Sequence, residues 1–230
     1  MHASMTRGLV ALRWPVGVLL TAWSYVWRTT PVHRREVEGD RDDLPPPLPA
    51  GTDDSHVQHW EDGAGTFLRR RYRVRVRDAR LGAVPLIERV AADPNLVVPG
   101  ELAHFHKDAG IEHLLRPGDR FTVRMPGPWD GPVMVVEVTP SSFRFATLDG
   151  HLEAGQIEWR AEDEPDGTLR FEIESRSRPG DRLSHLMHHR LRMAKEVQLH
   201  MWTSVHERVA RLCAGRLTGG IDIETRSVEG

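Results

Sequence analysis

One stripe of apolar residues near the end of the chain constrains the fold more than any other feature. Between Asp181 and Cys213 the apolar side chains recur at steps of three and four residues, which is the spacing of one face of an α-helix. They are Leu183, Leu186, Met187, Leu191, Ala194, Val197, Met201, Val205, Val209 and Leu212. Such a helix, about 48 Å long at ~1.5 Å per residue, cannot bury the stripe alone and needs a partner layer.

The residues upstream predict that this partner layer is a sheet. Seven segments show the alternating or continuous apolar pattern of β-strands, and the turns between most of them are short. We expect strands at 71–77, 101–107, 120–125, 133–138, 142–148, 156–162 and 168–177, with a short helix at 84–92. The expected fold class is α+β, in which a curved seven-stranded antiparallel sheet grips the long C-terminal helix Asp181–Cys213. This order of elements resembles the helix-grip, or START-like, fold.

The first of these strands carries a stripe of charge. Arg71, Arg73, Arg75 and Arg77 alternate with Tyr72, Val74 and Val76. We interpret the arginines as a solvated face paired with acidic neighbours, because charged stripes on strands usually have cross-strand partners. If the first strand pairs with the last, the arginines will lie beside Glu172 and Glu174.

The chain divides into four parts. Residues 1–30 contain the apolar stretch Gly8–Trp27, but its uninterrupted portion, Pro15–Trp27, is short of the ~20 residues of a membrane span. We expect a short helix there that docks on the domain, and we keep contact with a membrane surface, or a span, as alternatives. Residues 31–65 read as a charged, proline-rich linker that is extended or disordered. The folded domain is expected at 66–215, followed by a flexible tail at 216–230.

Composition excludes several classes of function. A formal net charge of -2 argues against a nucleic acid partner. The single cysteine, Cys213, rules out an internal disulfide and multi-cysteine metal motifs, and favours a cytoplasmic location. The phosphate-binding glycine loops and the Gly-x-Ser-x-Gly and His-Glu-x-x-His motifs are absent from the sequence. No cofactor is therefore expected.

Three motifs resemble the DUF1990 family of bacterial and plant proteins. Its members carry segments similar to GPWDGPV, SFRFATLxGHLEAGQIEF and AKEMQLHMW. The matching positions here are Gly127–Val133, Ser142–Glu158 and Ala194–Trp202, with Val197 in place of the first methionine of the third motif. The block Trp23–Arg34 is similar too. The resemblance implies no activity, because the family has none that can be carried over, and so it assigns no catalytic residue.

The alternation of the strands and the helical wheel together predict a ligand-binding layer. We expect the inward-facing and helix-facing side chains to line a cavity, with a tryptophan of the stiff loop 126–132 at its mouth. The predicted ligand-binding residues are Trp129, Phe143, Phe145, Trp159, Phe171, Gln198 and Trp202. The alternative is that these side chains only fill the core.

Candidate catalytic and metal-binding residues are few. His151 and Glu153 form the best acid/base pair in the sequence, with Asp130 as a further candidate, although loop hydrogen bonding is the favoured explanation for the pair. His104 with His106, and His185 with His189, have spacings that can hold zinc, but neither pair has an evident third ligand, so no metal is expected.

Three functions remain open. The first is binding of a small apolar or amphipathic molecule between sheet and helix. The second is an enzyme of the cyclase or hydrolase kind that uses His151 and Glu153. The third is a membrane-surface or protein-interaction module that acts through residues 8–27, in which case the cytoplasmic protein would be membrane-associated.

Overall fold

The computed structural model describes residues 30–125, 130–180 and 188–228, and only the backbone of 188–198. Its strands are β1 (Val32–Glu38), β2 (Phe67–Arg77), β3 (His104–Ala109), β4 (Arg120–Arg124), β5 (Asp130–Thr139), β6 (Ser142–Thr147), β7 (Glu153–Asp163), β8 (Leu169–Pro179) and β9 (Arg216–Val228). Its helices are α2 (Ala83–Ala92) and α4 (His188–Leu212), and its 3-10 turns are η1 (Arg41–Asp43), η2 (Trp60–Asp62) and η3 (Pro94–Leu96).

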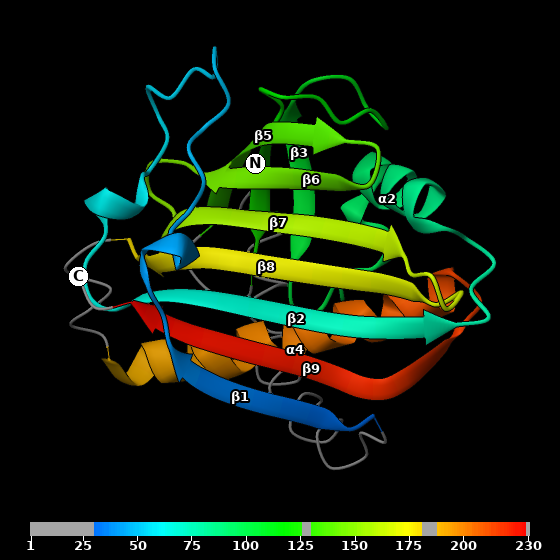
Figure 1. The fold of residues 1–230 in the computed structure, drawn as a ribbon. Coiled ribbons are helices and arrows are strands. Elements are labelled where there is room, and N and C mark those ends of the chain that lie inside the picture. The colour runs from blue at the N-terminus through cyan, green and yellow to red at the C-terminus, as the bar shows by residue number, and fades with distance from the viewer. Residues whose placement is uncertain (1–29, 126–129, 181–187, 229–230) are drawn as a thin grey trace.

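These strands form one sheet in the order β1-β9-β2-β8-β7-β6-β5-β4-β3. Every neighbouring pair is antiparallel except β1 and β9, which are parallel. Figure 1 shows α4 behind the sheet, while the segment between β1 and β2 passes in front of it. We call the side of the sheet that faces α4 the inward face and the opposite side the outward face.

The fold class is α+β, but the expected sheet of seven antiparallel strands is wrong. In the part of the chain that the structure describes, the sheet has nine strands, because the supposed linker contributes β1 and the supposed flexible tail contributes β9. β1 is mostly polar and β9 contains Gly219 and Gly220, so neither shows a clean apolar alternation. Each becomes a strand because β9 fits between β2 and β1 and bonds to both, which makes β1 one edge of the sheet and β3 the other.

The long helix differs from expectation at both of its ends. α4 spans His188–Leu212, and the expected start at Asp181 lies outside the described residues. It is not the C-terminal element, because Ala214 adopts a positive φ of 50° and the chain turns back into β9. The described buried side chains of this part of the chain are Met201, Trp202, Thr203, Val205, His206, Val209, Ala210 and Cys213.

The second helix, α2, packs on the same side of the core through Leu86, Ile87 and Val90. Its N-cap residue, Gly82, has no side chain that could cap the helix. Asp163 at the end of β7 replaces that cap, because both of its carboxylate oxygens accept from the Ala83 N–H, at 3.0 and 3.2 Å. No helix in the described part of the chain is long and apolar enough to cross a membrane.

The arginine stripe of β2 pairs as predicted. Arg71 lies opposite Glu174, and Arg73 lies opposite Glu172. Arg71 Nε donates to Glu174 at 2.8 Å and Arg73 Nε donates to Glu172 at 2.9 Å. The interpretation of the stripe as a solvated face is wrong for the acidic partners, because the side chains of Glu172 and Glu174 are only 3% exposed.

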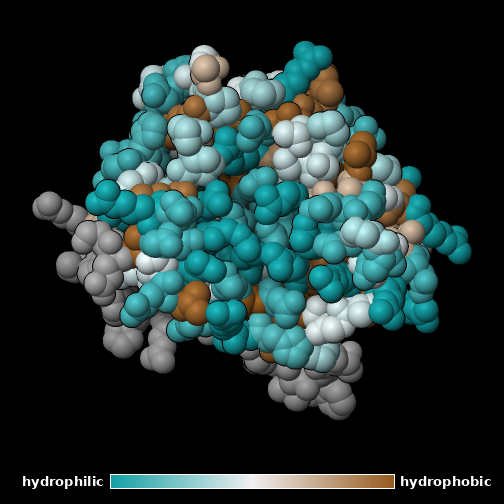
Figure 2. All heavy atoms as spheres, viewed as in Figure 1, coloured by the Kyte–Doolittle hydropathy of each residue, from teal (hydrophilic) through white to brown (hydrophobic). Residues whose placement is uncertain are grey.

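The charges continue across the outward face as one network. Opposed residues on β9, β2, β8, β7 and β6 are Glu224, Arg71, Glu174, Glu158 and Arg144, in that order. Burial, and then the neighbouring Glu174, raise the pKa of the Glu158 carboxyl above its usual value. Figure 2 shows that the middle of this face is hydrophilic.

The segment expected to be a loose linker packs against this network. Asp43, 2% exposed, accepts from Arg69 at 2.6 Å, and Gln156 donates to the Pro46 carbonyl at 3.0 Å. Val57 bridges to Leu148, and with Leu48 it packs on a small apolar cluster that also contains Met134, Val136 and Ala146. The linker is therefore ordered between residues 31 and 65, because a few apolar and charged anchors offset the entropy of an extended chain. The apolar N-terminal segment, residues 1–29, lies outside the described residues.

Candidate functional site

The inward face of the sheet carries a layer of aromatic side chains against α4. Phe143 stacks on Trp159 with ring centres 5.4 Å apart, and Trp202 of α4 meets Trp159 at 5.7 Å with perpendicular planes. Phe145 and Phe171 complete the group through edge contacts. Five of the predicted ligand-binding residues thus lie together, and all are buried. Of the other two, Trp129 lies outside the described residues, and Gln198 is described only as part of the helix backbone.

This apolar layer contains two unpaired polar groups. The indole N–H groups of Trp159 and Trp202 are buried and have no hydrogen-bond partner among the described residues. Trp159 is fully buried and Trp202 is 5% exposed, so water does not replace the missing acceptor at the surface. A buried donor without an acceptor costs about 1–3 kcal/mol, which makes the pair an exception that calls for an explanation.

The inward face becomes polar towards the start of β7 and the end of β8. Ser175 and Ser177 are buried, and their hydroxyl oxygens lie 3.2 Å apart. Ser177 then donates to a carboxylate oxygen of Glu153 at 3.1 Å. Sequence reasoning missed both serines, although they continue the inward alternation of Leu169, Phe171 and Ile173.

Tyr72 adds a buried phenol to the inward face. It is opposite Ile173 on β8 and Ile223 on β9. Burial, with a smaller contribution from Glu153, raises the pKa of Tyr72 to about 12, so the phenol is neutral at pH 7.

Two of the predicted acid/base residues are in contact, but the contact joins the His151 ring to the backbone of Glu153. His151 Nδ1 lies 2.9 Å from both the backbone nitrogen and the carbonyl oxygen of Glu153. Burial lowers the pKa of His151, so the neutral ring is favoured. The Glu153 carboxylate accepts from Ser177, and Asp130 is exposed at the start of β5. A proton-transfer role for these three residues stays a prediction.

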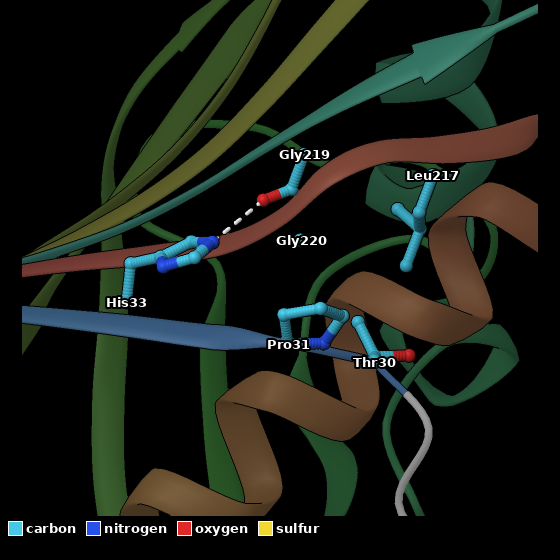
Figure 3. A pocket seen from close by; sticks show the side chains of 6 residues that line it. All are labelled: Thr30, Pro31, His33, Leu217, Gly219 and Gly220. Atoms are coloured by element: carbon cyan, nitrogen blue, oxygen red, sulfur yellow. Dashed lines mark hydrogen bonds between the residues drawn. The ribbon is translucent and has the colours of Figure 1, made fainter.

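The remaining features outside the aromatic layer are a surface pocket and scattered histidines. A pocket of about 370 Å³ lies at the start of β1 and β9, lined by Thr30, Pro31, His33, Leu217, Gly219 and Gly220. Figure 3 shows the His33 ring directed at the Gly219 carbonyl, which it contacts at 2.9 Å. In the described ranges no three His, Cys, Asp or Glu side chains are grouped so as to hold a metal ion. His185 lies outside those ranges, as does the side chain of His189.

A family model described as a domain of unknown function, DUF1990, matches residues 99–212. Residues 99–212 belong to the DUF1990 family. The match contains all three motifs, whereas the similar block Trp23–Arg34 precedes it. No curated protein matches the chain.

Solved structures resemble this chain at low identity. Ginseng major latex-like protein 151 from Panax ginseng is 13% identical, with 65% of this chain and 99% of that chain covered and a TM-score of 0.42. A hypothetical protein from Helicobacter pylori is 12% identical, with coverages of 77% and 99% and a TM-score of 0.47. The di-domain ARO/CYC StfQ from the steffimycin biosynthetic pathway is 10% identical, with coverages of 67% and 52% and a TM-score of 0.43.

The DUF1990 motifs occupy the two sides of the aromatic layer. The motif Ser142–Glu158 forms β6 and most of β7, and it supplies Phe143 and Phe145. The motif Ala194–Trp202 lies in α4 and ends on the tryptophan that meets Trp159. Of Gly127–Val133, the described part begins β5. The family's motifs therefore lie largely at one interface between sheet and helix.

A buried histidine beside this interface predicts a pH-dependent stability. His206 is fully buried in α4, with Nδ1 2.6 Å from the Trp202 carbonyl and Nε2 3.1 Å from the Tyr72 carbonyl. Burial lowers the pKa of His206 from 6.5 to about 4. As the pH falls from 6.5 to 4, the unfolded chain takes up a proton that the folded chain does not. We expect this difference to lower the free energy of unfolding by up to about 3 kcal/mol.

Urea unfolding at several pH values measures this dependence. The variant His206→Gln should show a smaller loss of stability between pH 6.5 and 4 than the native chain, whatever its stability at pH 7. The exposed His104, changed to Gln, is the matched control and should keep the native slope. A native slope in His206→Gln would contradict the prediction.

Proposed function

We propose that the protein binds a small amphipathic molecule between the inward face of the sheet and α4. The observation that carries this proposal is the division of the inward face into an aromatic centre and a polar end. Phe143, Trp159 and Phe171 form the centre, and the hydrogen-bonded Ser175, Ser177 and Glu153 form the end. A face built only to fill a core has no need of buried serines and a carboxylate.

The two halves would hold the two ends of the ligand. An apolar body gains about 25 cal/mol for each Å² of apolar surface that leaves water, and aromatic walls favour flat ring systems. A hydroxyl or amine at the polar end would donate to the Ser177 hydroxyl oxygen, beside Glu153. Trp129 and Gln198 stay predicted ligand contacts, and the loop with His151 would close this end.

We propose that the partner of the protein is a small molecule and not a nucleic acid. We also propose that the protein lies in the cytoplasm. Cys213 is the single cysteine of the chain and a buried free thiol, which is in keeping with a reducing compartment. Peripheral membrane contact through residues 8–27 is the alternative.

The test is native mass spectrometry of the protein purified from its own host. We expect an additional mass of a small molecule that is released when the protein unfolds. The variant Ser177→Ala should bind that molecule about 3–10-fold more weakly, because one hydrogen bond contributes ~0.5–1.5 kcal/mol. The exposed Ser55, changed to Ala, should bind it as the native chain does. A native protein without additional mass would count against the proposal.

A further inference from the structure

We propose that the indole N–H groups of Trp159 and Trp202 form a subsite for a neutral carbonyl oxygen of the ligand. The inference deepens the function proposed above and rests on it. It assigns the ligand to the ketones, esters, lactones or amides that carry a flat apolar body.

The first step is that these donors have nothing to bond in the described protein. The rings in contact with Trp159 are those of Phe105, Phe143, Phe171 and Trp202, and none offers an oxygen acceptor. The backbone carbonyls of Trp202 and Tyr72 lie against the two ring nitrogens of His206. An acceptor brought by a ligand would satisfy groups that are otherwise buried unpaired.

The second step is that the two donors can serve one molecule. Trp159 comes from β7 and Trp202 from α4, and their ring centres are 5.7 Å apart with planes at 90°. A single small molecule at their junction would therefore contact the sheet and the helix together. Its carbonyl oxygen has two lone pairs and can accept from both N–H groups.

The third step is that the acceptor is neutral. The rings around Trp159 carry no charge, and burial lowers the pKa of His206 to about 4, so that histidine is uncharged at pH 7. Lys107 extends over the Phe121 ring, but its ammonium already donates to Asp119 at 2.7 Å and to the Ile111 carbonyl at 2.7 Å. A carboxylate at the indoles would be buried without a counter-charge, which is far more costly than burying a carbonyl.

The experiment compares two probes that differ in the acceptor alone. Fluorenone and fluorene have the same three-ring skeleton, with a carbonyl in one where the other has a methylene group. We expect the full-length protein to bind fluorenone about tenfold more tightly than fluorene. In 1H–15N spectra, the indole proton signals of Trp159 and Trp202 should move downfield with fluorenone and not with fluorene.

Two variants test whether the preference for fluorenone over fluorene arises at the indole N–H groups. Trp202→Phe keeps a ring but removes the donor, and it should reduce the tenfold preference to about threefold or less. Trp60→Phe changes a tryptophan that packs on Phe67 and Arg178, away from this layer, and should keep the full preference. If Trp202→Phe does not fold, the spectra of the native chain decide.

The possible results distinguish a failure of the carbonyl subsite from a failure of the proposed ligand binding. Equal binding of the two probes with unmoved indole signals would overturn the carbonyl subsite and leave amphipathic ligand binding in place. Binding of neither probe, together with no co-purified molecule, would overturn both.

Discussion

Replacing Glu174 by alanine is expected to lower the free energy of unfolding by about 3–5 kcal/mol, because it removes a buried carboxylate that pairs with several half-buried arginines. Glu174 is 3% exposed and accepts from three of them: Arg69 at 2.7 Å, Arg71 at 2.8 Å and Arg176 at 2.7 Å. For a domain of this size the loss corresponds to a melting temperature lower by about 6–20 °C. Urea unfolding followed by circular dichroism measures it.

The matched control is Glu162→Ala on the neighbouring strand. Glu162 pairs with Arg170 but is 56% exposed, so its loss should change the free energy of unfolding by no more than about 1 kcal/mol. Equal effects of the two substitutions would mean that the outward network behaves as an ordinary solvated surface.

The second large effect is expected from Gly155→Ala, in the motif Ser142–Glu158. Gly155 has a φ of +151°, and a Cβ atom there would lie 2.1 Å from the Arg176 carbonyl oxygen on β8. Backbone strain and overlap with a paired strand, each about 1–3 kcal/mol, should together lower the free energy of unfolding by about 2–6 kcal/mol. The melting temperature measures this loss.

Comparison with Gly167→Ala distinguishes the cost of backbone strain from the cost of steric overlap. Gly167 also has a positive φ, +78°, but a Cβ atom there would meet nothing within 4 Å. We expect a loss of about 1 kcal/mol in this variant. A loss in Gly155→Ala no larger than that would show that β7 and β8 can separate to admit a methyl group.

Regular patterns of side chains made much of the fold predictable. Strict alternation placed Phe143, Trp159 and Phe171 on one face, because successive residues of a strand point to opposite sides. The same rule put Arg71 beside Glu174 once the first and last predicted strands were paired. The aromatic half of the candidate site was therefore foreseen.

Other parts could not be predicted from pattern. β1 and β9 have weak apolar alternation, and each is a strand only because a partner from a distant part of the chain supplies its hydrogen bonds. Ser175 and Ser177 have the spacing of inward-facing residues of their strand. A serine at such a position does not by itself predict a polar site, because its hydrogen-bond partners are not known from the sequence. The contact between Ser177 and Glu153 joins β8 to β7 and depends on their register.

What the sequence alone determined was which side chains share a face, since that follows from the local geometry of strand and helix. Only the tertiary structure decided what each face meets. It buried Glu172 and Glu174 among arginines of neighbouring strands, and it brought Trp202 against Trp159 with both N–H groups unpaired among the described residues. The physical reason is that burial and hydrogen-bond satisfaction belong to pairs of segments that are distant along the chain, and no local pattern records them.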